Sequence, residues 1–376
     1  MLRLFSDASS RVSDPFFARA IQLASRGAGS AWPNPIVGCV IVSEGRIVGE
    51  GYHPRAGEAH AEVFALAAAG SAARGADAYV TLEPCAHHGK TPPCTEALIA
   101  AGVSRVFIGM RDPNRDAAGG ADTLRAAGIA TEFAEDPSPF ATLNPGWLKR
   151  IEHGAPRVRV KVGATIDGKV AFEPGIRAAI TGTSGAQVTR QLRAATDAVC
   201  VSAATAIADD PALTVRDANG TLSEKQPLRV VLVRKILPPA DAALFSTSAG
   251  PTLVLASDLA DDDQLQSLRP SAGVLRWKSA DGLLGAWRAL AAHGVGELLV
   301  EAGPRLLTAL LKSEALDELV VVQAGGMGGC DALSMYQGPA DSVGEALSPR
   351  LRPVEAGIVS DVSVTVWSVE TRSHAE

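Results

Sequence analysis

Short apolar runs alternate with helix-like periodic segments over the first 150 residues. A helix is expected to begin at Pro15, with Asp14 as the residue that caps its amino end. Two β-branched runs at 37–42 and 46–51 flank a turn-like segment at 43–45, which predicts a hairpin. Further helices are expected at 61–69, 95–101 and up to Ala127, and further strands at 78–82 and 103–109. Strands that alternate with helices predict a three-layer α/β/α sandwich.

A second α/β domain is expected beyond the Gly/Pro break at 152–156. Its strands are expected at 157–164, 198–201, 228–233, 252–255, 298–301 and 319–323, with helices between them. The polar stretch 217–227 and the acidic cluster 261–263 are interpreted as solvated loops. The chain is therefore divided into a first domain, residues 1–152, and a second domain, residues 157–376.

Composition narrows the class of protein. With 376 residues, of which 47% are hydrophobic, the chain can fill two cores. A net charge of −6 and a pI near 5.7 argue against a nucleic-acid-binding protein, which usually carries a basic surface. The five cysteines show no paired spacing, and no apolar run approaches the roughly 20 residues needed to cross a membrane. A soluble protein of the reducing cytoplasm is expected.

The strongest chemical signal is His60-Ala61-Glu62, followed by Cys85 and Cys94. A catalytic zinc ion keeps three protein ligands and leaves its fourth position to a water molecule, whose pKa it lowers to about 7. His60, Cys85 and Cys94 supply three ligands, and Glu62 is a carboxylate that can move protons. Two isolated cysteines would more often be buried apolar residues. The ordered set instead predicts a zinc-dependent hydrolytic deaminase.

The spacing between the two cysteines departs from the common deaminase signature. That signature ends in Cys-x-x-Cys, whereas eight residues separate Cys85 from Cys94 here. The longer loop carries His87, His88 and Lys90, which could hold a phosphate group of the substrate. The alternative is that some of these three residues belong to a solvated surface turn.

Longer motifs in both domains point to one family. They are Ala-Trp-Pro-Asn-Pro-Ile-Val-Gly (31–38), Gly-Tyr-His (51–53), Gly-Glu-Ala-His-Ala-Glu (57–62), Thr-Leu-Glu-Pro-Cys-Ala-His-His-Gly-Lys-Thr-Pro-Pro-Cys (81–94), Arg-Asp-Pro-Asn (111–114), Lys-Val-Gly-Ala-Thr-Ile-Asp-Gly-Lys (161–169), Ala-Asp-Asp-Pro-Ala-Leu-Thr-Val-Arg (208–216) and Val-Glu-Ala-Gly-Pro (300–304). Together they resemble the bacterial bifunctional riboflavin-biosynthesis deaminase/reductase. The resemblance covers nearly the whole chain.

The resemblance implies a fold, two cofactors and two reactions. The first domain would be a cytidine-deaminase-like α/β/α sandwich, and the second a dihydrofolate-reductase-like α/β domain. The first would use Zn²⁺ to deaminate 2,5-diamino-6-(5-phosphoribosylamino)pyrimidin-4(3H)-one. The second would use NADPH to reduce the ribosyl group to a ribityl chain. A homodimer or higher homo-oligomer formed through the second domain is also expected.

The resemblance also assigns residues to the two sites. Contacts to the deaminase substrate would come from Asn34, His53, His87, Lys90 and Asn114. Contacts to NADPH would come from Gly163, Thr205, Asp209 and Gly303, and contacts to the reductase substrate from Arg193, Leu213, Arg216 and Glu301. Arg193 and Arg216 could clamp a ribose 5-phosphate, because guanidinium groups bind phosphate with two hydrogen bonds. The alternative for these two arginines is surface salt bridging.

Three segments of the second domain differ from the family pattern. Arg177-Ala178-Ala179 replaces a Ser-x-Trp segment, Val233-Arg234 replaces Asp-Ser, and Ala324-Gly325-Gly326-Met327-Gly328 replaces Pro-Lys-Leu-Leu-Gly. Backbone N–H groups of segment 325–329 could hold a phosphate, although such a loop is more often a simple turn. Two alternatives follow. The second domain could be a scaffold without reductase activity, or the chain could deaminate a related pterin or pyrimidine.

Overall fold

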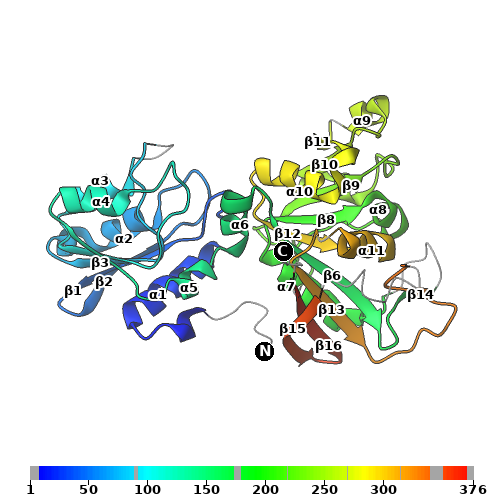
Figure 1. Ribbon diagram of the computed structural model, residues 1–376, viewed down its shortest axis with the longest axis horizontal. Coiled ribbons are helices and arrows are strands. Elements are labelled where there is room, and N and C mark those ends of the chain that lie inside the picture. The colour runs from blue at the N-terminus through cyan, green and yellow to red at the C-terminus, as the bar shows by residue number, and fades with distance from the viewer. Residues whose placement is uncertain are drawn as a thin grey trace, which may run out of the picture. The chain divides into compact units, whose positions relative to one another are not determined.

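The chain folds into two compact units. The computed structural model describes residues 8–88, 92–172, 179–217, 219–268, 270–313, 315–338 and 350–370. One unit holds the described residues up to His153 and the other holds those from Gly154 onward (Figure 1). Among the described residues, no helix is both long enough and apolar enough to cross a bilayer.

The first unit is built around a five-stranded sheet. Its order is β2 (Arg46–Tyr52), β1 (Gly38–Ser43), β3 (Asp77–Val80), β4 (Arg105–Ile108) and β5 (Ala130–Phe133). The pairs β1–β2 and β1–β3 are antiparallel, and β3–β4 and β4–β5 are parallel. The hairpin expected from the sequence is therefore confirmed.

Helices cover both faces of this sheet. Figure 1 shows α2 (Ala61–Ala69), α3 (Cys94–Ala101) and α4 (Gly120–Ala126) on one side, and α1 (Pro15–Ala24) and α5 (Ser138–Ala141) on the other. Strand β1 serves both layers, since Cys39 and Ile41 pack with the first group while Val40 and Val42 pack with the second. The predicted three-layer sandwich is confirmed.

Close packing sets the place where α2 begins. Helix α2 lies directly on β2, and a methyl group at Gly51 would come within 2.2 Å of the Ala61 carbonyl oxygen. His60 precedes the helix in extended conformation, and Gly70 ends it with a positive φ of 56°. Because Gly51 has no side chain, α2 can pack this closely on β2. This contact sets the position of His60, which directly precedes the helix.

The remaining elements of the first unit are short, except for its last helix. They are the 3₁₀ turns Ala8–Arg11, Ser25–Gly27 and Gly70–Ala73, and helix α6 (Pro145–His153). At the start of α1, Asp14 accepts hydrogen bonds from the Phe16 and Phe17 N–H groups, as expected of a capping residue.

The second unit contains a nine-stranded sheet. Its order is β11 (Gly273–Trp277), β10 (Thr252–Ser257), β9 (Leu228–Val233), β8 (Ala198–Ser202), β12 (Glu297–Glu301), β6 (Arg157–Thr165), β13 (Glu318–Ala324), β16 (Val362–Glu370) and β15 (Arg350–Val359). The pairings are parallel from β11 to β13, and the last two strands run antiparallel. Strands β7 (Lys169–Ala171) and β14 (Leu333–Ser334) form a separate small sheet.

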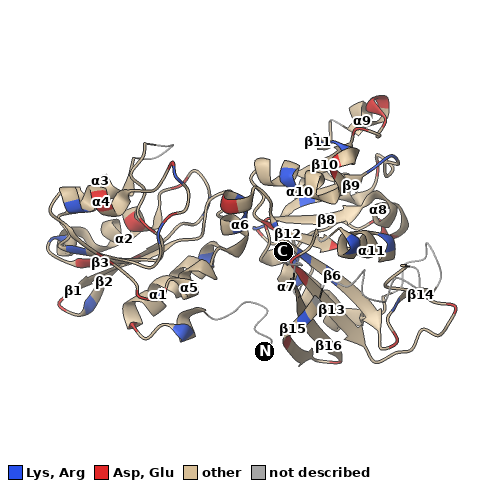
Figure 2. Cartoon of the chain, in the orientation of Figure 1, with Lys and Arg blue, Asp and Glu red and all other residues tan. Residues whose placement is uncertain are grey.

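Among the described residues of this unit, five helices connect these strands. They are α7 (Gly182–Ala194), α8 (Ala203–Asp209), α9 (Asp262–Leu268), α10 (Gly282–Ala292) and α11 (Pro304–Lys312), with 3₁₀ turns at Ala243–Phe245, Thr247–Ala249 and Ser279–Asp281. The predicted α/β organisation is confirmed. One interpretation was wrong, because the acidic cluster 261–263 opens helix α9 (Figure 2). Asp261 accepts the Gln264 N–H at 2.9 Å, and acidic side chains favour the amino end of a helix.

Candidate active sites

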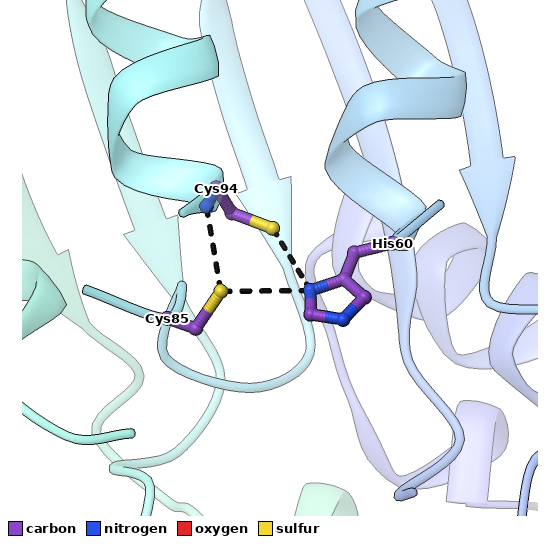
Figure 3. A group of neighbouring side chains, drawn as sticks. All are labelled: His60, Cys85 and Cys94. Atoms are coloured by element: carbon purple, nitrogen blue, oxygen red, sulfur yellow. Dashed lines mark hydrogen bonds between the residues drawn. The ribbon is translucent and has the colours of Figure 1, made fainter. Parts of the chain in front are cut away.

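Three predicted metal ligands meet in the first unit. His60 precedes α2, Cys85 follows β3, and Cys94 begins α3 (Figure 3). His60 Nδ1 lies 3.1 Å from Cys94 Sγ and 3.5 Å from Cys85 Sγ, and all three ligand atoms lie within 4.8 Å of one another. Zn–S bonds of ~2.3 Å and Zn–N bonds of ~2.0 Å in tetrahedral geometry separate ligand atoms by roughly 3.5–3.8 Å. The three side chains therefore fit one zinc ion.

The two thiols differ in acidity. The hydrogen bond from Cys94 is the main cause that lowers the pKa of Cys85 to about 4, with further help from His60. The Cys94 N–H group also donates to Cys85 Sγ at 3.4 Å. The same contact raises the pKa of Cys94. The pair thus loses one proton readily and keeps the second, which a bound divalent cation displaces.

Glu62 is a buried acid beside this cluster. Its exposed fraction is 3%, and it lies two residues after His60 in the first turn of α2. Burial is the main cause that raises the pKa of Glu62 above its ordinary value. A carboxyl group with a raised pKa can both accept and return a proton near neutral pH.

A cavity of about 460 Å³ gathers most of the predicted deaminase residues. Its wall includes Asn34, His53, His60, Glu62, Cys85, His87 and Asn114. Cys94 is fully buried behind this wall, and Lys90 lies outside the described residues. The cavity thus places side chains suited to recognising a ring beside the metal ligands.

His53 and Asn34 form a fixed pair in the cavity wall. His53 Nδ1 donates to the Ala59 carbonyl oxygen at 3.0 Å, which leaves Nε2 as an acceptor on the neutral ring. Asn34 Nδ2 donates to that nitrogen at 3.1 Å. Burial lowers the pKa of His53, in agreement with a neutral ring. His53 therefore sets the orientation of the Asn34 amide.

Asp112 and Glu83 hold the segment that carries Asn114, and neither was predicted to be a site residue. Asp112 lines the cavity, accepts the Asn114 N–H at 2.8 Å, and has its pKa raised to about 6, chiefly by burial. Glu83 accepts the N–H groups of Asp112 at 3.2 Å and Ala121 at 3.0 Å. Both acids occur in the motifs 81–94 and 111–114, but their role depends on contacts between distant segments. Glu83 thereby connects the zinc-ligand segment to the segment that carries Asn114.

The last helix of the first unit completes the cavity. Trp147, Arg150 and Ile151 of α6 are wall residues. The sequence pattern marked this segment only as the end of a domain, so their place in the site was also missed. Its helical periodicity gave no indication of which face meets the cavity.

Three of the predicted residues of the second unit lie near the carboxyl ends of its parallel strands. Thr205 follows β8, Glu301 ends β12, and Gly303 precedes α11. A methyl group at Gly303 would lie 3.2 Å from Thr205 Oγ1, so these two residues are neighbours. Asp209 ends helix α8. Ligands of open α/β sheets bind at this edge.

Arg193 and Glu301 form a partly buried ion pair, with side-chain exposed fractions of 15% and 17%. Arg193 Nε lies 2.5 Å from Glu301 Oε1, and Arg193 Nη2 donates to Glu301 Oε2 at 2.9 Å. Lys161 interacts electrostatically with both, and burial lowers its pKa. A methyl group at Gly163 would lie 3.6 Å from the Lys161 Nζ atom. Lys161 was missed because its motif 161–169 was assigned through Gly163 alone.

The segment that carries Leu213 and Arg216 has an unusual backbone. Asp210 and Leu213 adopt positive φ angles of 40° and 53°, although neither is glycine. The Leu213 side chain is 1% exposed and belongs to the core. Arg193 donates to the Thr214 carbonyl oxygen, whereas the exposed Arg216 donates to that of Gly220. Strain of this kind is typical of functional loops.

The glycine-rich segment 325–329 has a partner within the protein. The Gly328 and Gly329 N–H groups each donate to the Asp167 carboxylate at 2.9 Å. The Thr165 hydroxyl also donates to Asp167, and these bonds lower the pKa of Asp167 to about 2. The hypothesis that these amides hold a phosphate is therefore corrected, since Asp167 takes that place.

The structure describes some of the other residues that depart from the family pattern. Ala179 is exposed, and Arg177 and Ala178 lie outside the described residues. Val233 is a fully buried core residue at the end of β9, and the Arg234 carbonyl oxygen accepts the Ser257 hydroxyl at 2.6 Å.

Two known family models match the chain, one in each of its two units. A model described as the cytidine and deoxycytidylate deaminase zinc-binding region matches residues 11–110. A model described as the RibD C-terminal domain matches residues 156–359. The zinc-ligand cluster lies inside the first match, and the Arg193–Glu301 pair lies inside the second.

Several relatives match over most of their length. The riboflavin biosynthesis protein RibD of Escherichia coli (strain K12) is 42% identical over 337 residues, which are 84% of this chain and 89% of that protein. The structure of Acinetobacter baumannii RibD, form 1, has a TM-score of 0.86 at 34% identity and covers 97% of this chain and 99% of its own. A Thermotoga maritima structure, described as a diaminohydroxyphosphoribosylaminopyrimidine deaminase/5-amino-6-(5-phosphoribosylamino)uracil reductase, has a TM-score of 0.79 at 30% identity and covers 96% and 99%.

Proposed function

Because this chain belongs to the RibD family of bifunctional deaminase/reductases in riboflavin biosynthesis, we propose that it catalyses two consecutive reactions on one phosphorylated pyrimidine. The first would replace the 2-amino group of 2,5-diamino-6-(5-phosphoribosylamino)pyrimidin-4(3H)-one with oxygen. The second would open the ribosyl group to a ribityl chain. The observation that carries the proposal is the cluster His60, Cys85 and Cys94 beside Glu62 in a cavity wall.

In the deaminase unit, His60, Cys85 and Cys94 would hold zinc. The ion supplies a water molecule whose pKa is lowered to about 7. Glu62 would take a proton from the attacking water and pass it to the ring nitrogen. It would then take the proton of the new hydroxyl group and pass it to the amino group, so that the C–N bond breaks and ammonia leaves. The raised pKa of Glu62 suits this transfer.

Polar side chains of the cavity would orient the pyrimidine. Asn34 and Asn114 offer donors and acceptors for the ring edge. His53 fixes the Asn34 amide, and Asp112 fixes the backbone of Asn114. His87 and Lys90 would contact the phosphate.

In the reductase unit, NADPH supplies a hydride to the ribose C1. Gly163, Thr205, Asp209 and Gly303 would contact this cofactor, and Arg193, Leu213, Arg216 and Glu301 the substrate. The closeness of Gly303 to Thr205 fits a cradle for a phosphate, because a side chain at residue 303 would fill it. Glu301 holds Arg193 in place, which would present its remaining N–H groups to an anionic substrate.

The test supplies the phosphorylated diaminopyrimidine to the full-length enzyme, with and without NADPH, and follows the products by mass. The expected result is exchange of one amino group for oxygen in both samples, and a gain of two hydrogens only with NADPH. Deamination without NADPH consumption would support the alternative of a non-catalytic second domain. Release of ammonia only from a pterin or another pyrimidine would support the other alternative.

The proposal also includes a cytoplasmic location and a homo-oligomeric state. None of the five cysteines forms a disulfide, which suits a reducing cytoplasm. A homo-oligomer through the second unit is supported by the edge strand β15, where Val354 and Ile358 are 60% and 77% exposed. Exposed apolar edge strands tend to pair with another chain. Light scattering coupled to size exclusion would give a monomer mass if this is wrong.

A further inference from the structure

The deaminase cavity extends beyond the region shared with other zinc deaminases. The cytidine and deoxycytidylate deaminase model ends at residue 110 and includes every zinc ligand and Glu62. Asp112, Asn114, Ala117, Trp147, Arg150 and Ile151 line the same cavity but follow that region. Features that suit one particular substrate are therefore expected among these later residues.

Helix α6 is firmly attached at the cavity. Asn144, just before the helix, is buried, accepts the Ile36 N–H at 2.7 Å and donates to the Ile36 carbonyl oxygen at 2.9 Å. Arg150 Nη2 donates to the Pro33 carbonyl oxygen at 2.8 Å. Pro33 and Asn34 belong to the cavity wall. The guanidinium group of Arg150 is thus held beside the residues expected to read the pyrimidine.

Arg150 carries a positive charge in a cavity wall whose other charged residues are mostly acidic. Among the described residues that line the cavity, the acids are Glu58, Glu62, Glu83 and Asp112, and Arg150 is the one Arg or Lys. A phosphorylated substrate brings negative charge into this acidic surrounding. A guanidinium stays charged at all relevant pH values and presents its N–H donors in a fork that matches a phosphate group.

We propose that Arg150 binds the phosphate of the deaminase substrate and makes the first unit select phosphorylated over unphosphorylated pyrimidines. The inference rests on the proposed function, from which it takes the phosphate. It adds a binding residue from the last helix of the unit, outside the zinc-binding region. Trp147 and Ile151 form the apolar wall on either side of it along the helix.

The test compares two substrates in each of four full-length, zinc-loaded proteins. The substrates are the phosphorylated diaminopyrimidine and the same compound without its phosphate, and the readout is ammonia release. The proteins are the native enzyme, Arg150→Gln, Arg150→Lys and the control Lys149→Gln, which changes the neighbouring cation outside the cavity wall. The ratio of kcat/KM for the two substrates cancels any loss of folded protein.

Arg150→Gln is expected to lower kcat/KM for the phosphorylated substrate roughly ten- to a hundredfold, as a lost charged hydrogen bond does, and to leave the other substrate nearly unchanged. Arg150→Lys should recover part of the loss, and Lys149→Gln should keep the native ratio. An equal loss on both substrates, or none, overturns the role of Arg150 and leaves the proposed function intact. If the native enzyme releases no ammonia from either compound, the proposed function fails and this inference fails with it.

Discussion

We expect proton transfer in the first unit to depend on one side chain, that of Glu62. Glu62→Gln keeps nearly the same shape but cannot carry a proton, so deamination should fall by at least 10²–10⁴-fold, the usual contribution of a general acid–base group. Zinc content should stay near one ion per chain, because Glu62 is not among the three clustered ligands. Metal analysis and ammonia release check both parts. Near-native activity in a zinc-loaded variant would remove Glu62 from the mechanism.

The Arg193–Glu301 pair makes the second unit sensitive to acid. Burial opposes ionisation of Glu301, but Arg193 and Lys161 outweigh it, so its pKa lies below the ordinary 4.5. The carboxylate therefore stabilises the fold fully above pH 4.5, and that stabilisation is lost as the pH falls from 4.5 through the lowered pKa. At pH 7, Glu301→Gln should lower the free energy of unfolding by roughly 1–3 kcal/mol, because it leaves a partly buried arginine without its counter-charge.

Denaturant unfolding of both proteins at several pH values measures this effect. The difference in unfolding free energy between native enzyme and Glu301→Gln should shrink steadily below pH 4.5. Arg216→Gln is a suitable control, because Arg216 is exposed and donates to the neutral Gly220 carbonyl group. A difference that does not change with pH would contradict the ionic origin.

Local motifs made some site residues predictable and left others hidden. His60, Glu62, Cys85 and Cys94 form one ordered pattern, so their types and spacing indicate the chemistry. Glu83, Asp112, Arg150 and Lys161 owe their places to contacts with segments distant in the chain, such as that of Arg150 with Pro33. A sequence pattern does not give such contacts.

At the scale of elements, caps and apolar periodicity located the buried helices well. Helices α1 and α2 begin after Asp14 and His60 as predicted, since these boundaries depend on local signals. Strands β5, β7, β11, β14, β15 and β16 were not predicted. Alternate residues of β5 are exposed, and both faces of β15 are largely exposed, so neither shows the apolar run of a central strand.

The contact of β2 with α2 gives a test at this scale. Gly51→Ala places a methyl group 2.2 Å from the Ala61 carbonyl oxygen and should push the start of α2 away. We expect a loss of roughly 1–3 kcal/mol in stability, typical of overpacking, and weaker zinc binding, because His60 precedes the helix. Thermal unfolding and zinc titration check this. Gly325→Ala, where nothing lies within 4 Å, should be neutral for both.

At the scale of the whole molecule, each unit has its own core and its own cofactor. The core clusters around Ile41 and Val40 belong to the first unit, and the cluster around Val231 belongs to the second. A ligand that binds only the folded state at 100 times its Kd adds about 2.7 kcal/mol of stability. Zinc should therefore raise the Tm of the first unit, and NADPH that of the second.

Scanning calorimetry of the full chain, with chelator or NADPH added separately, distinguishes these effects. Chelator should lower one transition and leave the other in place, while NADPH should raise only the second. An NADPH-independent second transition would favour the scaffold alternative.

Helix α6 ends the first unit, so the residues that line the cavity continue beyond the segment that holds the zinc ligands. The residues expected to activate water and move protons all precede residue 110, whereas Asp112, Asn114, Trp147 and Arg150 come after it. Substitutions at residues 111–153 are therefore expected to change the substrate and to leave the hydrolytic centre unchanged. On the proposed role of Arg150, a deaminase shortened before α6 would keep its zinc ligands and lose its selectivity for the phosphorylated compound.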